Sequence, residues 1–316
     1  MSGAVGQHPT SQTSDSSNSR FFQPSKLLGL EKLRFTTRRR VEGSYSGRHV
    51  AKQRGGSGEF VDFREYAPGD DLRRLDWKAM GRTGRSYLKL FQDETDLQCT
   101  MLLDCSGSML QGSAGPYNAR GSKLEWSQYF CTALAHLITL GRDAIGVATA
   151  GKDLGEYLPP ACSERQRALV HRVLENLRAK GPGDLPGCLN ELLMQSRRRG
   201  VLMLLSDFLV DDLTPVVAGL RNFRAKGWEV LALHLVHPDE VQLPEGSAVR
   251  FVDWEVGNAV NCQIAEIQEA YQERFARHVE DTRSALLAVG CDYHYIATEV
   301  DYIEFLRSFM VSRNAG

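Results

Sequence analysis

Short apolar runs alternate with longer segments of helical periodicity from about residue 96 onward. The apolar runs are bounded by polar residues and predict β-strands, which we place at 97–104, 144–150, 201–207, 229–236 and 292–297. The segments between them predict helices, one of which is expected to begin with a capping box of Ser163 and Gln166. Strands that are apolar on both faces and alternate with helices are typical of α/β proteins, in which a mostly parallel sheet carries helices on both faces.

The residues before this pattern differ in composition. Residues 1–20 are rich in Ser, Thr, Gln and Asn and carry few large apolar side chains, so we predict a disordered tail. Leucines at helical spacing in 26–35 predict a short amphipathic helix, and two β-rich segments, EFVDFREY and RSYLKLFQDE, bracket the turn-prone APGDD. The expected organisation is therefore a tail over 1–20, a helix with a small β-rich N-terminal extension over 21–95, and an α/β domain over 96–316.

Composition and charge argue against several classes of protein. The 38 Lys and Arg nearly balance the 39 Asp and Glu, and the sequence pI is near 6.7, so no overall positive field favours nucleic acid. No stretch reaches the about 20 apolar residues that span a bilayer, and the N-terminus lacks a secretory signal pattern, so we expect a cytoplasmic protein without a membrane span. Seven scattered cysteines without a C-x-x-C pair predict reduced thiols rather than a cysteine zinc site.

Two of the predicted strands end on an aspartate, Asp104 in LLDCSGS and Asp207 in LLSDF. The carboxyl ends of parallel strands share one edge of a sheet, where α/β proteins bind their ligands. Ser106 and Ser108 follow Asp104 directly, and carboxylate and hydroxyl oxygens are ligands that Mg²⁺ prefers, so the pattern predicts a magnesium site. The alternative is that the two serines cap the next helix and that Asp104 accepts backbone N–H groups in the turn.

Three segments carry a family resemblance, and they are GSGEFVDFREYAPGDDLRRLDWKAMGRTGRSYLKLFQDE, LLDCSGSM and LLSDFL. From about residue 45 to about residue 300 the chain resembles domain of unknown function family 58. The resemblance implies a von Willebrand factor A-like, Rossmann-like fold. It also implies a metal-ion-dependent adhesion site, in which Asp104, Ser106 and Ser108 match the D-x-S-x-S motif and Asp207 matches the later aspartate. Members are commonly encoded beside AAA+ ATPases of the MoxR type, so such an ATPase is the implied partner in chaperone-like complex assembly.

One position departs from the family pattern. Relatives often show a G-G-T-D-L-like loop whose threonine hydroxyl contributes to the site, whereas KGPGDLPG here places Gly183 where the threonine would fall. The next residue, Asp184, could supply the missing oxygen, or the site could be degenerate and only structural. We therefore predict the four motif residues named above as Mg²⁺ ligands, with Asp184 as the candidate replacement.

Several other polar residues are expected to be structural. Leu75 and Trp77 should anchor the extension to the α/β domain within a salt-bridge network of neighbouring Asp and Arg side chains. The alternative is a docking surface for the ATPase, and the role of the arginines stays open. The histidines His136, His234 and His237 are interpreted as structural, and imidazole is not a preferred magnesium ligand.

Two functions remain after these exclusions. The first is a non-enzymatic adaptor that grips a carboxylate of a partner protein through the metal ion. The second is a metal-dependent phosphoesterase that uses Asp104, although aspartyl phosphatases need a second Asp two positions later, where this chain has Ser106. Neither a P-loop nor a G-x-S-x-G motif is present. We therefore predict an adaptor that works with a MoxR-type ATPase on a client that the sequence does not identify.

Overall fold

The computed structural model describes residues 19–36, 59–65, 80–82, 86–92, 97–112, 121–243, 249–252, 257 and 259–314. The chain divides into two compact units, one formed by residues 1–36 with 98–316 and the other by residues 37–97. Among the helices of the described residues, none has both the length and the apolar character needed to cross a membrane.

The smaller unit contains an antiparallel pair of strands, β1 (Glu59–Glu65) and β2 (Tyr87–Gln92). These strands fall on the two segments that the sequence marks as β-rich. The expected anchors Leu75 and Trp77, with the rest of residues 66–79, lie outside the described residues.

The larger unit is built on a six-stranded sheet with the order β10-β7-β6-β3-β4-β5. Its strands are β3 (Gln98–Asp104), β4 (Ala144–Ala150), β5 (Leu154–Ala161), β6 (Val201–Ser206), β7 (Glu229–Val236) and β10 (Asp292–Ala297). All neighbouring pairs are parallel except β4 and β5. From β3 the chain builds outward through β4 and β5, and then returns to build the other half through β6, β7 and β10, which is the doubly wound order. The predicted α/β fold with a mostly parallel sheet is confirmed.

The strand β5 was not predicted from the apolar pattern. Its sequence, LGEYLPPA, is only partly buried and contains Pro159 and Pro160. Proline has no backbone N–H to donate, so strands that contain it are confined to sheet edges. β5 occupies such an edge, where burial of one face only leaves no uninterrupted apolar run.

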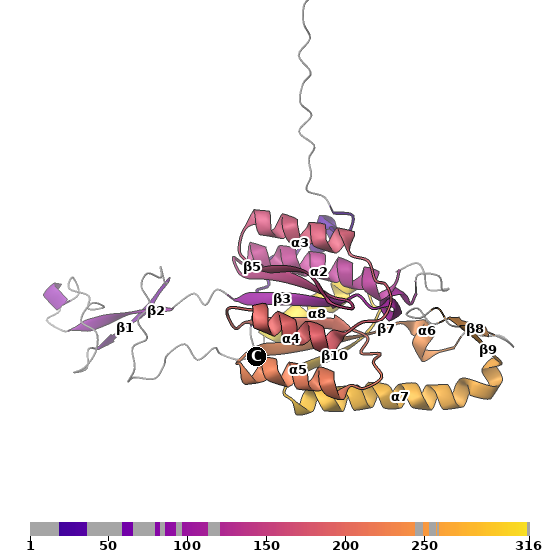
Figure 1. Ribbon diagram of the computed structural model, residues 1–316. Coiled ribbons are helices and arrows are strands. Elements are labelled where there is room, and N and C mark those ends of the chain that lie inside the picture. The colour runs from indigo at the N-terminus through magenta and orange to yellow at the C-terminus, as the bar shows by residue number, and fades with distance from the viewer. Residues whose placement is uncertain are drawn as a thin grey trace, which may run out of the picture. The chain divides into compact units, whose positions relative to one another are not determined.

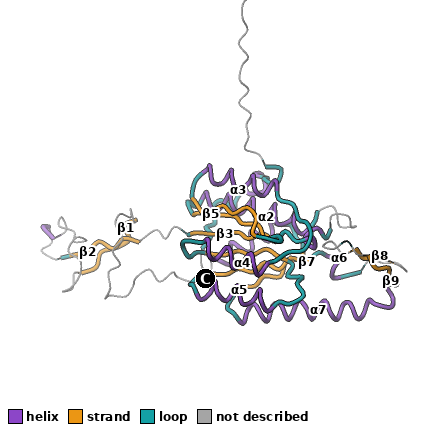
Figure 2. Tube along the Cα trace, in the orientation of Figure 1, coloured by secondary structure: helices purple, strands orange, loops and turns teal. Residues whose placement is uncertain are grey.

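Helices cover both faces of the sheet (Figure 1), and Figure 2 shows the strands between the two helical layers. One layer consists of α2 (Lys123–Leu140), α3 (Glu164–Asn176) and α8 (Tyr302–Asn314), and the other of α4 (Leu185–Gln195), α5 (Thr214–Ala225) and α7 (Ile264–Ala288). The short helix α6 (Pro238–Val241) follows β7, and a hairpin of β8 (Val249–Val252) and β9 (Ala259–Cys262) precedes α7.

Only half of the predicted capping box forms at the start of α3. The side chain of Ser163 accepts a hydrogen bond of 3.0 Å from the Gln166 N–H, as expected. The Gln166 amide, however, donates to the carbonyls of Ile145 and Pro159. This side chain therefore ties α3 to the sheet instead of closing the box.

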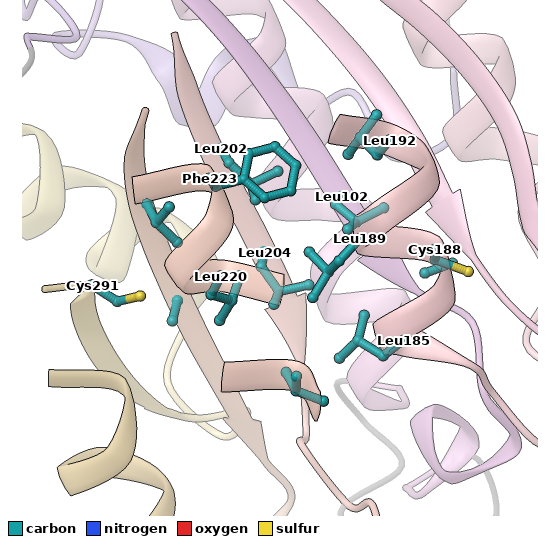
Figure 3. Close-up of a cluster of buried hydrophobic side chains, with 14 of the residues drawn as sticks. Leu102, Leu185, Cys188, Leu189, Leu192, Leu202, Leu204, Leu220, Phe223 and Cys291 are labelled. Carbon is teal, nitrogen blue, oxygen red and sulfur yellow. The ribbon is translucent and has the colours of Figure 1, made fainter. Parts of the chain in front are cut away.

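A cluster of buried apolar side chains holds α4 against the sheet (Figure 3). Leu185, Leu189 and Leu192 recur at intervals of a helical turn and pack with Leu202 and Leu204 of β6. Because α4 begins at Leu185, this packing also fixes the position of the loop that leads into it.

The segment of residues 19–36 differs from expectation, because it packs on the α/β unit rather than belonging to the extension. Instead of an amphipathic helix over 26–35, it forms one 3₁₀ turn, η1 (Pro24–Leu27), and Gly29 at φ 87° prevents a regular helix from continuing. The ring of Phe21 contacts Tyr129 of α2 edge to face. The predicted disordered tail lies outside the described residues except for its last two, which bond to Glu175.

Two adjacent leucines provide a matched test of this packing. Leu27 is 1% exposed and Leu28 is 69% exposed. We expect Leu27→Ala to lower the free energy of unfolding by about 2–4 kcal/mol, because it leaves a cavity. Leu28→Ala should change it by less than about 0.5 kcal/mol. Urea unfolding of both variants measures the difference, and equal effects would show that the segment does not pack as described.

Candidate functional site

The predicted site lies where the two halves of the sheet meet. β3 and β6 are neighbouring parallel strands, and the chain continues from them to opposite sides of the sheet. Asp104 is the last residue of β3, and Asp207 directly follows β6. A doubly wound sheet binds ligands in the crevice at this switch point, at the carboxyl ends of its strands. The topology therefore brings the two predicted carboxylates together at the position where such folds bind ligands.

The loop after β3 gathers three of the predicted oxygen donors. The Ser106 N–H donates to Asp104 Oδ1 at 2.9 Å, and the hydroxyl oxygens of Ser106 and Ser108 lie 3.1 Å apart. A 3₁₀ turn, η3 (Gly107–Leu110), follows, and the Ser106 side chain makes no capping bond to it. The turn bond to Asp104 expected in the structural alternative is present, but the cap of α2 is Ser122 rather than either serine of the motif.

The second carboxylate, Asp207, meets a buried lysine. Its Oδ2 accepts a hydrogen bond of 2.6 Å from Lys123 Nζ, and its Oδ1 accepts one of 3.1 Å from the Leu209 N–H. Lys123 Nζ also forms an ion pair with Glu240 of α6. The nearby Ser108 side chain also helps to lower the pKa of Asp207, so this carboxylate lies close to the β3 loop.

Three residues of this surrounding network were not among the predicted site residues. Ser206 donates its hydroxyl to Asp104 Oδ2 at 2.6 Å, and Lys123 and Glu240 form the buried ion pairs. Ser206 could have been found from its place beside Asp207 at the end of an apolar run. Lys123 carries a weaker signal, namely a basic residue in the first turn of a helix, where acidic residues are favoured.

The electrostatics of the two aspartates differ. The pKa of Asp104 is raised to about 6. Burial is the largest cause, and repulsion by the neighbouring Asp207 carboxylate is the second. Burial also acts to raise the pKa of Asp207, but the Lys123 ammonium holds it below its usual range. The cluster thus contains three carboxyl groups and one ammonium, and Asp104 is the carboxyl group that a further cation would stabilise.

The loop of residues 180–184 passes beside these oxygens. The Gly107 N–H donates to the Gly181 carbonyl at 2.7 Å, and the Lys180 N–H donates to the Cys105 carbonyl at 2.9 Å. A Cβ atom built on Gly183 would lie 3.1 Å from the Ser106 Cβ and 3.8 Å from Asp104 Oδ1. The position expected for the threonine of the family loop is therefore adjacent to the cluster.

Asp184, the candidate replacement ligand, has a different bond. Its carboxylate accepts a hydrogen bond of 3.0 Å from the Gly187 N–H and caps α4. The side chain is exposed, in contrast to those of Asp104 and Asp207. The structure thus engages Asp184 in capping and brings together the other four predicted residues.

The three histidines make hydrogen bonds typical of structural side chains. His136 Nδ1 lies 2.9 Å from Arg167, and His234 Nδ1 lies 2.8 Å from the Tyr293 hydroxyl. His237 Nδ1 accepts the Asp239 N–H at 3.2 Å at the start of α6. With the histidines engaged in these bonds, the possible metal ligands around Asp104 are carboxylate and hydroxyl oxygens. Such a ligand set suits a hard divalent cation such as Mg²⁺.

Comparisons with known proteins place the chain in a family. It is 25% identical to the uncharacterized protein Rv1480 of Mycobacterium tuberculosis over 300 residues, which cover 93% of this chain and 91% of that protein. The structure of BatB from Bacteroides thetaiotaomicron is similar with a TM-score of 0.45 and 18% identity, covering 69% of this chain and 98% of that one. A von Willebrand factor type A structure from Catenulispora acidiphila gives a TM-score of 0.42 and 13% identity, covering 82% and 51%. The sequence model of the family described as "Protein of unknown function DUF58" matches residues 62–284, which is more than half of the chain, and the chain therefore belongs to this family.

Proposed function

We propose that this protein is an adaptor that binds a carboxylate of a partner protein through a divalent metal ion and works with a MoxR-type AAA+ ATPase in cytoplasmic, chaperone-like complex assembly. The observation that supports the proposal is the convergence of Asp104, Ser106, Ser108 and Asp207 at the switch point of the sheet. The von Willebrand factor A-like fold is in keeping with a role in protein interaction.

Mg²⁺ is the ion that these donors suit. The Asp104 carboxylate and the hydroxyls of Ser106 and Ser108 would hold it, and Asp207, which lies close to Ser108, would support it from outside the coordination shell. Mg²⁺ is usually bound by one or two carboxylates and keeps several waters, so positions remain for an acidic group of a partner. The ion would also offset the negative charge that raises the pKa of Asp104.

The proposal of an ATPase as partner rests on the family resemblance and on the lack of a nucleotide-binding P-loop in the sequence. The chain has no G-x-x-x-x-G-K-[ST] loop, so nucleotide hydrolysis in such an assembly would come from the partner. The arginines of the acidic and basic segment at residues 65–85 are the candidate docking residues for the ATPase, while Leu75 and Trp77 are expected to be structural.

The alternative of a metal-dependent phosphoesterase has less support from the site. Asp104 is 5% exposed, and both of its carboxylate oxygens accept hydrogen bonds. A nucleophilic carboxylate must itself reach the substrate, whereas a metal ligand needs to reach only the ion, so this burial counts against the phosphoesterase. Ser106 also stands where the second acid of an aspartyl phosphatase would be needed.

Metal removal tests the adaptor. The full chain, immobilised and incubated with the purified MoxR-type ATPase of the same organism, should retain the ATPase in Mg²⁺ and release it in EDTA. A parallel assay with an aryl phosphate should show no metal-dependent turnover. Retention that does not depend on the metal would overturn the metal-mediated contact, and metal-dependent turnover that requires Asp104 would favour the phosphoesterase.

The affinity for the metal should also depend on pH. A proton and a metal ion compete for Asp104, whose pKa is raised to about 6. The affinity for Mn²⁺ is therefore expected to fall by about tenfold per pH unit below about pH 6 and to level off above it. Calorimetric titration on both sides of this pH measures the effect, and an affinity that stays constant below it would show that Asp104 does not bind the ion.

A further inference from the structure

Lys123 occupies a position that is unfavourable for a lysine in two ways. It is the first residue of α2, and its side chain has 0% exposure. Burial removes the ammonium from water, and a positive charge at a helix N-terminus opposes the helix dipole. Lysine is almost never fully buried unless it is paired. A lysine at this position therefore does not serve the stability of α2. Its presence must be explained by the groups with which it forms ion pairs.

Lys123 and a backbone N–H together hold Asp207, which is one of the two aspartates of the candidate metal site. Lys123 Nζ donates to Asp207 Oδ2 at 2.6 Å, and the Leu209 N–H donates to Asp207 Oδ1 at 3.1 Å. On its other side the ammonium is paired with Glu240, which is held in turn by the His237 N–H at 2.7 Å from Oε2. Both oxygens of Asp207 are thus engaged, one of them by a full positive charge.

Asp104 has different surroundings. Within the part of the chain that the structure describes, its hydrogen bonds come from neutral groups, namely the Ser206 hydroxyl at 2.6 Å and the Ser106 N–H at 2.9 Å. Among the residues that the structure describes, no lysine or arginine forms an ion pair with Asp104. The two carboxylates are therefore not equivalent toward a metal ion, since one is already neutralised and the other is not.

We infer that Lys123 is a positioning residue of the metal site, which holds the Asp207 carboxylate away from direct coordination and thereby limits the affinity of the site for divalent cations. This inference rests on the proposed function. The ammonium repels the incoming cation and competes with it for Asp207, so the ion is held mainly by Asp104, Ser106 and Ser108. Asp207, held by Lys123 and the Leu209 N–H, then supports the site from outside the coordination shell.

A matched pair of variants isolates the charge of Lys123. Lys123→Met alone leaves Asp207 and Glu240 buried without a counter-charge, which can prevent folding. We therefore compare Glu240→Gln with the double variant Lys123→Met and Glu240→Gln. Calorimetric titration with Mn²⁺, together with the shift of the melting temperature that Mn²⁺ causes, is expected to show at least about tenfold tighter binding in the double variant. Lys123→Arg, which keeps the charge, should retain the affinity of the parent.

A second test does not depend on changing Lys123. If the lysine withholds Asp207 from the ion, Asp207→Asn should weaken Mn²⁺ binding by less than about fivefold, far less than Asp104→Asn does. Lys123 keeps Glu240 as a partner in this variant, so folding is expected. Equal losses in the two variants would overturn the inference, because Asp207 would then bind the ion as directly as Asp104.

The outcomes separate this inference from the proposed function. If the parent binds Mn²⁺ through Asp104 but the double variant binds no more tightly than Glu240→Gln, then Lys123 is structural and only the inference fails. If Asp104→Asn binds Mn²⁺ as well as the parent, then the metal site itself is wrong. A lower melting temperature with unchanged affinity also contradicts a positioning role.

Discussion

Asp104→Asn is expected to lower the affinity for Mg²⁺ or Mn²⁺ by at least about 100-fold and to abolish metal-dependent association with a partner. Asp104 is the carboxylate of the site that has no cationic partner among the described residues, so the substitution removes the charge that would attract the ion. The metal-free protein should keep its fold, because an amide relieves the repulsion from Asp207 and is close in shape to the carboxylate. Calorimetric titration and circular dichroism measure the two effects.

Asp184→Asn is the matched control for this variant. Asparagine caps helices as well as aspartate does, so α4 should be unaffected. Unchanged metal affinity in this control, with loss in Asp104→Asn, assigns the ion to the β3 loop. A loss in the control would identify Asp184 as the replacement for the missing threonine, and full affinity in Asp104→Asn would disprove the site.

Gly183→Thr is expected to tighten Mg²⁺ or Mn²⁺ binding by about tenfold, because it adds a hydroxyl beside Asp104 and Ser106. A Cβ at this position lies 3.8 Å from Asp104 Oδ1, which puts a threonine hydroxyl within reach of the cluster. The φ of Gly183 is outside the left-handed region, so a β-branched residue is not strained there by the backbone. The contact of 3.1 Å with the Ser106 Cβ requires a small movement of that loop.

Gly183→Val separates the hydroxyl from this steric effect. Valine has the shape of threonine and makes the same contact with Ser106, but it offers no oxygen ligand. Tighter binding in Gly183→Thr and not in Gly183→Val supports coordination by the hydroxyl. Equal affinities in the two variants, measured with equal melting temperatures, would mean that the loop does not take part in metal binding.

The parts of the fold that could be predicted are those determined by residues close to one another in the sequence. The apolar runs that end at Asp104 and Asp207 mark fully buried strands, and the turn from Asp104 to Ser106 closes within two residues. The D-x-S-x-S spacing therefore places its oxygens together in almost any fold that ends a strand there. The edge strand β5 was missed because one-sided burial and Pro159 with Pro160 remove the apolar run on which strand prediction depends.

The remaining features were decided by tertiary structure, because they join residues that are far apart in the chain. Lys123 meets Asp207 across 84 positions and Glu240 across 117, and no local pattern specifies such a pair. The segment of residues 19–36 likewise leaves the expected helix because burial of Phe21 and Leu27 against the α/β unit outweighs a weak local helical preference. The sequence by itself thus determined which oxygens stand at the strand ends, since that follows from short-range periodicity. Only the folded sheet determined which of the two aspartates is neutralised by a buried ammonium, since that depends on which distant side chains the strand order brings within a few ångströms.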